Sequence, residues 1–494
     1  MKSLGHEFAP NDAGRICSGE QNKASTMIAD LKPYPDYQES GAAWIGQIPS
    51  HWATMPNRAL FEEVKDRNHP DEEMLSVTIT RGIIRQKALL LGTSKKDSSN
   101  LNKSAYKLVQ PGDLAYNKMR AWQGAVGASH FRGIISPAYV VMRPRKGCNP
   151  AFYHHLYRTP SFQKEAERWS YGITSDMWSL RPEHFKVIYS VLPPPSEQAA
   201  IVRFLDWANG RLERAIRAKR KVIALLQEQK QAIIHKAVTQ GLDPNVPKRD
   251  SGIPWLGEIP AHWEVIPIKR VASVLNGFAF PSEVYTDSGI PLIRIGDVKA
   301  TGAVDIEKSA KLPTNYLGSH SFVELKCGDL VMAMTGATIG KVAKYSHDGP
   351  SLLNQRVCAF RSRSGRVKQE YLFLLLSSRV YLQQVLMACY GGAQPNISDS
   401  TLSGFKMPMA PFGIQAEIVE FVENQTAVLT TAIERYEREI TLLREYRTRL
   451  VADLVTGKLD VREAALLIPA DDVALAPEDL VEEGEGPELE EFEG

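Results

Sequence analysis

The sequence has few cysteines, and they form no recognisable pattern. Its 494 residues contain five, at positions 17, 148, 327, 358 and 389, an odd number with wide spacings. A disulfide framework needs an even set, and zinc sites need short spacings such as C-x-x-C or H-E-x-x-H. We therefore expect neither disulfides nor a bound metal, and a reducing cytoplasm suits this composition.

Long apolar runs are also missing. No stretch approaches the roughly 20 uncharged residues of a membrane-spanning helix. The N-terminal residues Met1–Glu7 lack the apolar core of a signal peptide. The sequence therefore predicts a chain that is neither inserted in a membrane nor secreted, with about two to four domains for its length.

Basic residues are absent from the C-terminal tail. Residues 469–494 hold eleven acidic residues and no lysine or arginine, which is typical of a disordered, solvating tail. The whole chain has a formal net charge of +2, but the chain without this tail carries +13. A basic body favours a polyanionic partner.

The signatures of the common DNA-modifying enzymes are not found. No N-P-P-Y or D-P-P-Y tetrapeptide is present, and Gly336–Val342 is one residue short of a phosphate-binding loop. Asp305 with Glu324 and Lys326 resembles a metal-nuclease pattern, but the matching stretch of the first half, Leu108–Gln110, has no carboxylate. These absences favour binding over turnover, with no catalytic residue in this chain.

An internal repeat organises the sequence. Ser40–Trp52 returns as Ser251–Trp263 with eight of thirteen positions identical, and Gln198–Asp243 aligns without gaps on Gln415–Asp460 with 16 of 46 identical. The chain is thus two copies of one unit of roughly 215 residues, which is too long for a solenoid repeat. Each copy contains a tryptophan motif, a globular segment and a long helix.

Two long helices are predicted from proline-free stretches that run from Ser196 to Pro244 and from Gly413 past Leu459. Both contain an apolar seam at heptad spacing, and both place a cation, Lys230 or Arg447, at the same step. We expect the two seams to pack on each other; the alternative is that each helix packs only on its own domain. The seams are Leu212, Ile216, Lys219, Ile223, Leu226, Lys230, Ile233 and Ala237, and Leu429, Ile433, Tyr436, Ile440, Leu443, Arg447, Leu450 and Leu454.

The intervening segments are predicted to be α+β domains with mostly non-parallel sheets. Short β-rich runs at 74–79, 138–142, 291–295 and 357–360 alternate with turns. Helical stretches are expected near 152–170 and 369–388. Both segments are basic: residues 53–190 hold 21 Lys and Arg against 12 Asp and Glu, and residues 264–409 hold 16 against 11.

Both globular segments contain polar clusters of the kind that binds nucleic acid. Cations meet phosphates, and amides, hydroxyls or guanidinium groups meet base edges. Any single member could be an ordinary surface residue, but clusters recur in both copies while their sequences differ, which indicates one task performed on two targets. The candidates are Arg81, Arg85, Lys87, Lys95, Lys96, Lys103, Asn117, Lys118, Arg120 and Trp122 in the first copy, and Arg294, Thr335, Thr338, Lys341, Asn354, Gln355, Arg356, Gln394, Asn396 and Ser398 in the second.

Several motifs together resemble the specificity subunits of Type I restriction–modification systems. They are the repeated Trp-x-Gly-x-Ile-Pro-x-His-Trp element, the Gly-Asp-Leu turns at 112–114 and 328–330, the segment 391–398, and the Pro-x-x-x-Gln-x-x-Ile-Val openings at 194–202 and 411–419. The resemblance covers about residues 40–460. It implies a non-catalytic subunit in which two target-recognition domains each read one half of a split, asymmetric DNA sequence.

The resemblance also implies partners. The two helices would form an antiparallel coiled coil that sets the gap between the half-sites and docks two methylation subunits, which restriction subunits join. S-adenosylmethionine, ATP and magnesium would be bound by those partners and not by this chain. The first copy has Gly172–Trp178 where the second has Gly391–Asn396, so the DNA-contact role of Gln394 and Asn396 does not carry over to it.

The implied organisation has six parts. An N-terminal extension (1–39) precedes the first recognition domain (40–190), the central helix with its linker (191–250) and the second recognition domain (251–408); the C-terminal helix (409–462) and the acidic tail (463–494) follow. The seam from Leu212 to Ala237 corresponds to about 39 Å of helix, close to one turn of B-DNA at roughly 34–36 Å. We therefore expect half-sites about one turn apart. The alternative function is a DNA-modifying or DNA-cleaving enzyme that acts alone.

Overall fold

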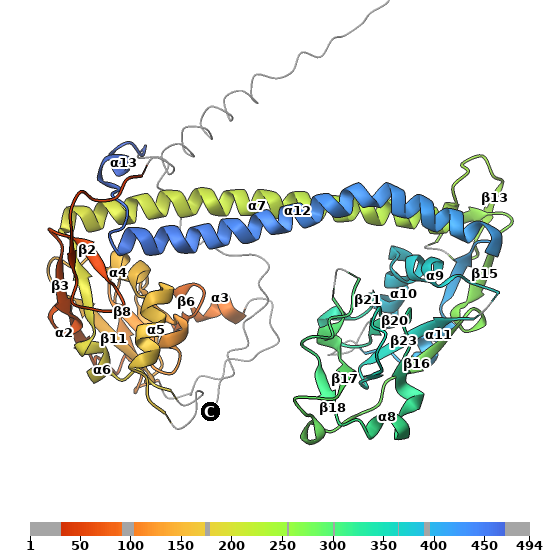
Figure 1. Ribbon diagram of the computed structural model, residues 1–494, viewed down its shortest axis with the longest axis horizontal. Coiled ribbons are helices and arrows are strands. Elements are labelled where there is room, and N and C mark those ends of the chain that lie inside the picture. The colour runs from red at the N-terminus through yellow and green to blue at the C-terminus, as the bar shows by residue number, and fades with distance from the viewer. Residues whose placement is uncertain are drawn as a thin grey trace, which may run out of the picture. The chain divides into compact units, whose positions relative to one another are not determined.

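The computed structural model has the expected α+β composition (Figure 1). It forms two compact units, one made of residues up to Ala218 and from Glu439 onward, the other of Lys219–Arg438. Each unit holds one globular domain and a part of both long helices. Residues 1–30 of the expected N-terminal extension (1–39) and residues 470–494 of the expected tail (463–494) lie outside the described residues, which are 31–90, 103–172, 178–253, 256–299, 302–363, 365–389 and 396–469.

The two long helices are α7 (Pro195–Gln240) and α12 (Gln415–Val455). In unit 1, Arg447 lies 3.4 Å from the Glu213 carboxylate. In unit 2, Lys230 donates a hydrogen bond to Thr430 over 2.9 Å, and the Lys219 ammonium lies 5.2 Å from the centre of the Tyr436 ring. From Glu213 through Lys219 to Lys230 along α7, the partner on α12 moves back from Arg447 through Tyr436 to Thr430, so the two helices are antiparallel. The expected pairing is therefore confirmed, and the alternative of separate packing is wrong.

The predicted seam lies inside these helix pairs. Of its sixteen positions, Leu212, Ile216, Ala237, Ile440, Leu450 and Leu454 are buried and the others are half-buried. The repeat offset of 217 residues carries Glu213 and Arg447 onto Thr430 and Lys230. One polar cross-helix pair thus occurs twice, once in each unit.

A four-stranded antiparallel sheet recurs in both domains with the same strand order. In the first domain the order is β4 (Phe61–Val64), β11 (Tyr139–Pro144), β8 (Leu114–Asn117) and β9 (Val126–Ala128). In the second it is β16 (Ala272–Asn276), β23 (Val357–Ser362), β20 (Leu330–Ala333) and β21 (Val342–Lys344).

The other sheets are small and mostly antiparallel, as expected, except that β17 runs parallel to β22. The outer part of the first domain has the pairs β5 (Leu75–Thr78) with β6 (Gly82–Arg85) and β7 (Lys107–Val109) with β10 (Gly133–Ile135). The outer part of the second has the order β18 (Ala310–Leu312), β17 (Ile290–Ile293), β22 (Ser351–Leu353) and β19 (Glu324–Leu325). Shared pairs are β1 (Tyr37–Glu39) with β2 (Gln47–Pro49), β3 (Ala53–Pro56) with β12 (Tyr189–Leu192), β13 (Lys248–Asp250) with β14 (Glu258–Pro260), and β15 (Glu264–Pro267) with β24 (Lys406–Met409).

The helical stretches predicted near 152–170 and 369–388 are each split into two short helices. Pro160 stands at the first break, where the Thr159 side chain caps the second helix. The α-helices are α2 (Asn57–Leu60), α3 (Gln86–Leu90), α4 (Pro150–Leu156), α5 (Pro160–Arg168), α6 (Pro182–Val187), α8 (Tyr316–Ser319), α9 (Gln369–Leu376), α10 (Arg379–Ala388), α11 (Asp399–Gly404) and α13 (Arg462–Leu466). The short 3₁₀ turns that concern the site are η1 (Ala121–Gln123), η5 (Ile295–Asp297) and η7 (Gly336–Thr338).

Among the described residues, no helix is by itself long and apolar enough to cross a bilayer. The bent pair α9 and α10 passes the length and composition test only when both helices are counted together.

The repeated Gly-Asp-Leu turn holds an ion pair between a buried aspartate and a partly exposed arginine. Asp113 accepts two hydrogen bonds from Arg143, at 2.8 and 3.0 Å, and Asp329 accepts two from Arg361, at 2.8 and 2.5 Å. Both carboxylates are only 2% exposed. The motif therefore stabilises the four-stranded sheet in each domain.

The repeated glutamine at the start of each long helix fixes that helix to its own domain. The Gln198 amide donates to the carbonyls of Pro193 and Gly147 and accepts from the Asn149 backbone N–H. Gln415 makes the equivalent bonds to the carbonyls of Ala410 and Arg366 and from the Lys368 backbone N–H. Both glutamines are fully buried.

The tryptophan motif packs against the end of a long helix in each unit. Gly457 closes α12 with φ +77°, and a Cβ there would come within 2.3 Å of Pro49 and 3.0 Å of Trp52. Gly241 closes α7 with φ +74° and lies against Trp263 in the same way. Only glycine combines this backbone conformation with such a close approach.

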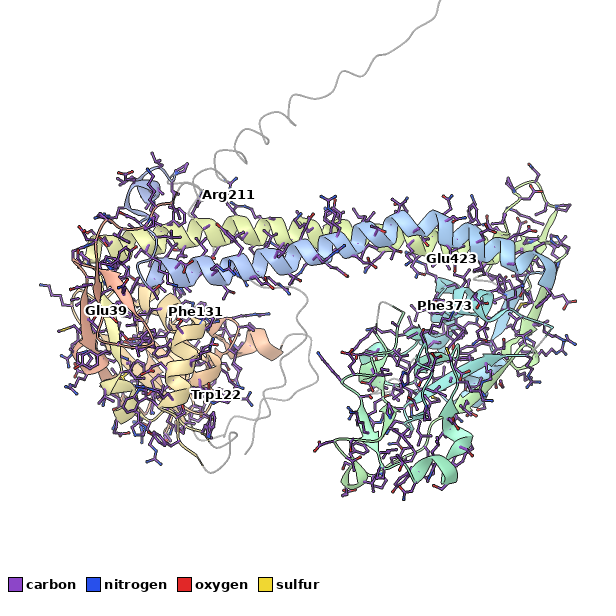
Figure 2. All side chains as sticks on the ribbon, in the orientation of Figure 1. Glu39, Trp122, Phe131, Arg211, Phe373 and Glu423 are labelled. Atoms are coloured by element: carbon purple, nitrogen blue, oxygen red, sulfur yellow. The ribbon has the colours of Figure 1, made fainter. Side chains whose placement is uncertain are left out.

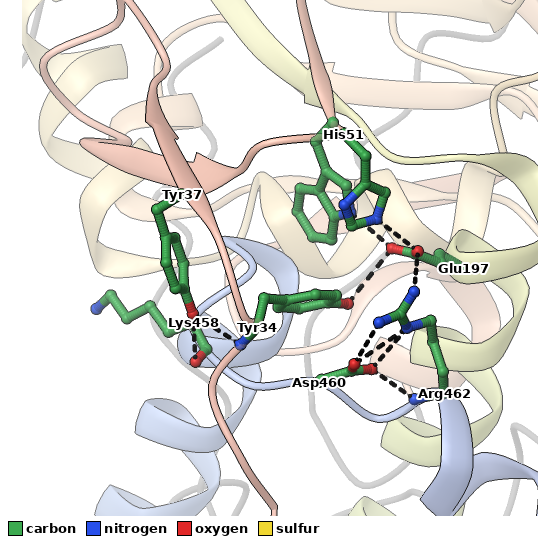
Figure 3. A network of polar contacts seen from close by, with 8 residues as sticks. Tyr34, Tyr37, His51, Glu197, Lys458, Asp460 and Arg462 are labelled. Carbon is green, nitrogen blue, oxygen red and sulfur yellow. Dashed lines mark hydrogen bonds and ion pairs between the residues drawn. The ribbon is translucent and has the colours of Figure 1, made fainter.

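In unit 1, a network of charged and polar side chains also links the tryptophan motif to the residues that follow α12 (Figure 3). The Glu197 carboxylate accepts a hydrogen bond from Trp52 Nε1 over 2.6 Å, and it lies 2.7 Å from His51 and 3.4 Å from Arg462. Arg462 also pairs with Asp460, whose backbone N–H donates to the Lys32 carbonyl. The network therefore joins the segment before β1 to the segment that follows α12.

Candidate nucleic-acid interface

In the first domain, four of the predicted contact residues, Asn117, Lys118, Arg120 and Trp122, lie at the end of β8 and in the loop that follows it. Asn117 Oδ1 accepts from the Met119 backbone N–H, and Trp122 Nε1 donates to the Met119 carbonyl, so two of the four side chains also order the loop. The Trp122 ring stands edge-on to Trp178 at 5.6 Å. Figure 2 shows Trp122 at the part of the first domain that is remote from the long helices.

This loop is joined to a second segment that the sequence did not single out. The Leu180 backbone N–H donates to the Lys118 carbonyl over 2.9 Å, and Tyr171 pairs with Ser179 through two backbone hydrogen bonds. A cavity of about 630 Å³ lies between the two segments. It is lined by Lys118, Tyr171, Gly172, Ser179, Arg181, Pro182 and Glu183.

Tyr171 and Arg181 are therefore additional candidates. Tyr171-Gly172 is echoed by Tyr390-Gly391 in the second copy, which was a usable sequence signal for that position. Arg181 follows no motif, and only the fold brings it beside Lys118.

The remaining candidates of the first domain lie elsewhere. Arg85 lies 4.8 Å from the centre of the Phe131 ring and 3.4 Å from Glu73, and Lys87 lies 3.7 Å from the same carboxylate. Arg81 is half-buried in the β5–β6 turn. Lys103 and Arg120 are half-buried, and Lys95 and Lys96 lie outside the described residues.

In the second domain, four separate segments that contain predicted residues meet. The Asn354 backbone N–H donates to the carbonyl of Ile293, next to Arg294, and the Met334 N–H donates to the Arg356 carbonyl. Thr335 forms a backbone bridge with Asn396. Gly277 allows the chain to cross here, because a Cβ at that position would lie 1.9 Å from the Asn354 carbonyl oxygen.

The side chains of this second cluster differ in exposure. Gln355, Arg356, Lys341, Asn396 and Ser398 are exposed, Arg294, Thr338 and Asn354 are half-buried, and Thr335 is buried. The Ser398 hydroxyl caps α11 by accepting from the Thr401 N–H. The Arg294 guanidinium lies 6.0 Å from the centre of the Tyr285 ring. Gln394 lies outside the described residues.

One backbone joint is common to both clusters. In the first domain, the Leu180 N–H meets the Lys118 carbonyl; in the second, the Ile397 N–H meets the Met334 carbonyl over 3.2 Å. Each joint connects the loop after β8 or β20 to the residues before α6 or α11. The side chains around the joint are unrelated in the two domains, so one scaffold presents two chemically different surfaces.

Two titratable residues near the first cluster are structural. Burial lowers the pKa of Lys107, whose ammonium donates to the Tyr139 carbonyl. Burial also lowers the pKa of His154 well below its usual value, and its Nδ1 accepts from the Ala128 N–H, so the imidazole is neutral. Among the described residues, no group of three histidine, cysteine or acidic side chains is placed to hold a metal ion.

Comparison with known proteins gives a consistent result. The family described as Type I restriction modification DNA specificity domain matches residues 260–443. The Type I restriction enzyme MjaVIII specificity subunit of Methanocaldococcus jannaschii is 28% identical over 351 residues, which are 69% of this chain and 78% of that protein. The StySPI specificity subunit of Salmonella potsdam is 21% identical over 438 residues, 84% of this chain and 90% of that protein.

A solved structure shares the fold. Its description concerns complex assembly and conformational transition of the Type I R-M system. It superposes with a TM-score of 0.52 at 15% identity and covers 83% of this chain and 98% of that chain.

Proposed function

The chain belongs to the family of Type I restriction–modification specificity subunits, and on that premise we propose that it is the DNA sequence-recognition subunit of such a complex. Its two globular domains read the two halves of an asymmetric target. It performs no catalysis itself, and it works in the cytoplasm, where the DNA is.

The observation that carries this proposal is the backbone hydrogen bond that both domains share, Leu180 to Lys118 in the first and Ile397 to Met334 in the second, with unrelated side chains around it. Lys118, Ser179 and Arg181 surround the joint of the first domain, and Met334, Asn396 and Ser398 surround that of the second. A duplicated scaffold with the same side chains would support a palindromic target. Different side chains at equivalent places support two different half-sites.

The long helices are proposed to dock two methylation subunits, which bind S-adenosylmethionine, and restriction subunits that bind ATP and magnesium join them. Leu225 and Leu442 are equivalent under the repeat offset and are 57% and 62% exposed. A single exposed leucine is ordinary on a protein surface, but its repetition at the same place in both copies makes this position our candidate for the contact. One such residue at the same place in each copy supports two copies of one partner.

DNA binding by the complex of this chain with its methylation subunits tests the proposal. We expect Arg356→Ala or Gln355→Ala to relax preference in one half-site only, with a cost of about 1–3 kcal/mol for each lost base contact. Lys103→Ala should instead weaken binding equally for all sequences and reduce the salt dependence. Unchanged preference in both halves would remove Gln355 and Arg356 from the reading set.

The alternative of an enzyme acting alone has a separate test. The purified chain is incubated with unmethylated DNA, magnesium and S-adenosylmethionine. We expect neither methylation nor cleavage until the partner subunits are added. Turnover by the isolated chain would contradict the proposed function.

A further inference from the structure

The lining of the cavity in the first domain contains charges of both signs. Its lining includes two cations, Lys118 and Arg181, one carboxylate, Glu183, and the hydroxyls of Tyr171 and Ser179. Arg181, Glu183 and Tyr171 are exposed, and Tyr171 has 58% of its surface accessible. The cavity therefore offers both hydrogen-bond donors and an acceptor to a ligand.

The charged groups of this cavity have no evident structural duty. Within the described part of the chain, neither the Arg181 guanidinium nor the Glu183 carboxylate has a hydrogen-bond or ion-pair partner. Arg181 stands at the N-cap of α6 but makes no side-chain cap bond there. Arg181 and Glu183 lie on either side of Pro182 but do not pair with each other. Both charges are therefore available to a third group.

The backbone that carries these side chains is nevertheless held in place. The chain on both sides of the cavity is tied by the Leu180–Lys118 hydrogen bond and by the Tyr171–Ser179 pair. The Tyr171 ring packs on His184 at 5.1 Å, and Pro182 restricts the backbone between Arg181 and Glu183. A rigid frame with unpaired polar tips is suited to recognition.

The mixed charge distinguishes between two ligands that DNA can offer. A phosphate has only acceptor oxygens and a negative charge, so a carboxylate beside it is unfavourable. A base pair in the major groove offers acceptors and an amino donor together. Guanine presents N7 and O6 to the paired donors of an arginine, and cytosine presents its N4 amino group to a glutamate or aspartate.

We propose that the cavity lined by Lys118, Tyr171, Arg181 and Glu183 is a base-reading subsite of the first domain that selects a guanine–cytosine pair, with Arg181 on guanine and Glu183 on cytosine. This inference rests on the proposed function and identifies residues that specify one position of one half-site.

The test uses the full complex with its methylation and restriction subunits in a host, followed by sequencing of the methylated DNA. Arg181→Ala and Glu183→Gln should each relax the methylated motif at one position, which is a guanine–cytosine pair in the wild type, and leave the other half unchanged. Measured as binding of target DNA against DNA with that pair replaced, the loss of discrimination should be about 5- to 140-fold.

Arg181→Lys separates base reading from a simple charge effect. Lysine keeps the charge but has no fork of two parallel donors, so this variant should lose discrimination nearly as alanine does. Arg58→Ala and Glu62→Gln, exposed positions of the same domain outside the cavity lining, are the matched controls and should leave the motif unchanged.

Three outcomes overturn the inference. They are an unchanged motif in the Arg181 and Glu183 variants, equal weakening at all sequences, and relaxation at an adenine–thymine pair. In each of these cases, a sequence-specific motif from the wild-type complex would leave the proposed function standing. Absence of any specific motif from the wild type would contradict the proposed function itself.

Discussion

The two copies of the repeat share their buried structural contacts and differ in the side chains of their polar loops. The ion pairs Asp113–Arg143 and Asp329–Arg361 are both two-pronged, and Gln198 and Gln415 make the same three kinds of hydrogen bond. Around the common backbone joint, no side chain is shared. The comparison indicates that the repeated residues maintain the fold, whereas the divergent loops form the proposed recognition surfaces.

One structural contact, between Glu197 and the tryptophan motif, is present in the first copy only. Glu197 accepts from the Trp52 indole, but Ile414 occupies the equivalent position of the second copy, and Trp263 Nε1 is buried with no hydrogen-bond partner among the described residues. The covalent chain explains the difference. In unit 2, α7 continues directly into β13, whereas in unit 1 the corresponding joint between Asp460 and Lys32 is held without a peptide bond. The charged network takes the place of that bond.

The largest expected effect comes from breaking the helix pair, which both copies share. Leu226→Asp combined with Leu443→Asp places carboxylates at half-buried seam positions, at a cost of about 3 kcal/mol or more per site. We expect loss of helix pairing and of assembly with methylation subunits, measured by thermal unfolding and size-exclusion chromatography, while each globular domain still folds. An intact complex would show that the seam is not where the helices pair.

The matched control is the adjacent, exposed pair. Leu225→Asp with Leu442→Asp should leave the thermal stability within about 0.5 kcal/mol of the wild type, but it should weaken the binding of methylation subunits. Normal assembly of this variant would remove the two leucines from the proposed docking site.

A smaller and symmetric effect is expected from the ion pairs. Asp113→Asn and Asp329→Asn each leave an arginine without its charged partner, and because the arginines are partly exposed we expect a loss of about 2 kcal/mol. Each loss should appear in the unit that contains the substitution, by hydrogen exchange of its four-stranded sheet. Exposed Asp66→Asn is the control. A large loss in one unit and none in the other would contradict the equivalence of the two scaffolds.

Glu197→Gln should destabilise unit 1 and leave unit 2 unchanged. The amide retains the shape of the side chain but loses the charge that Arg462 and His51 meet, so we expect unit 1 to lose about 1–2 kcal/mol. Faster hydrogen exchange in residues 31–52, with no change in unit 2, is the expected readout. Glu417→Gln, an exposed position in the first turn of α12, provides the control. Equal loosening of both units would show that Glu197 does not act locally.

The smallest effect concerns pH. Burial holds the pKa of His154 well below that of the unfolded chain, near 6.5. The unfolded state therefore binds more protons below pH 6.5, and the stability of unit 1 is lost as the pH falls below that value, by about 1 kcal/mol near pH 5.5. His154→Asn retains an acceptor for the Ala128 N–H and should flatten this pH dependence in urea unfolding. An unchanged slope would place its origin in other titratable groups of unit 1.

The sequence predicted the features that occur in both copies of the repeat. It did not predict contacts between residues that are far apart in the chain and belong to no repeated motif. The helix pair follows from heptad spacing, and the Gly-Asp-Leu and glutamine motifs marked buried contacts because one fold imposes them twice. The cavity residue Arg181 belongs to no repeat. It reaches Lys118, more than sixty residues earlier, only through the backbone bond of Leu180, and such a non-local joint leaves no periodic signal.

Sequencing of methylated DNA from a host that expresses the complete wild-type system tests the central claim most directly. Two copies with one scaffold and two different surfaces predict a bipartite motif whose halves differ in sequence, separated by several unread base pairs, with centres about one helical turn apart. Recovery of a continuous motif, or of a palindromic one with identical halves, would contradict the account.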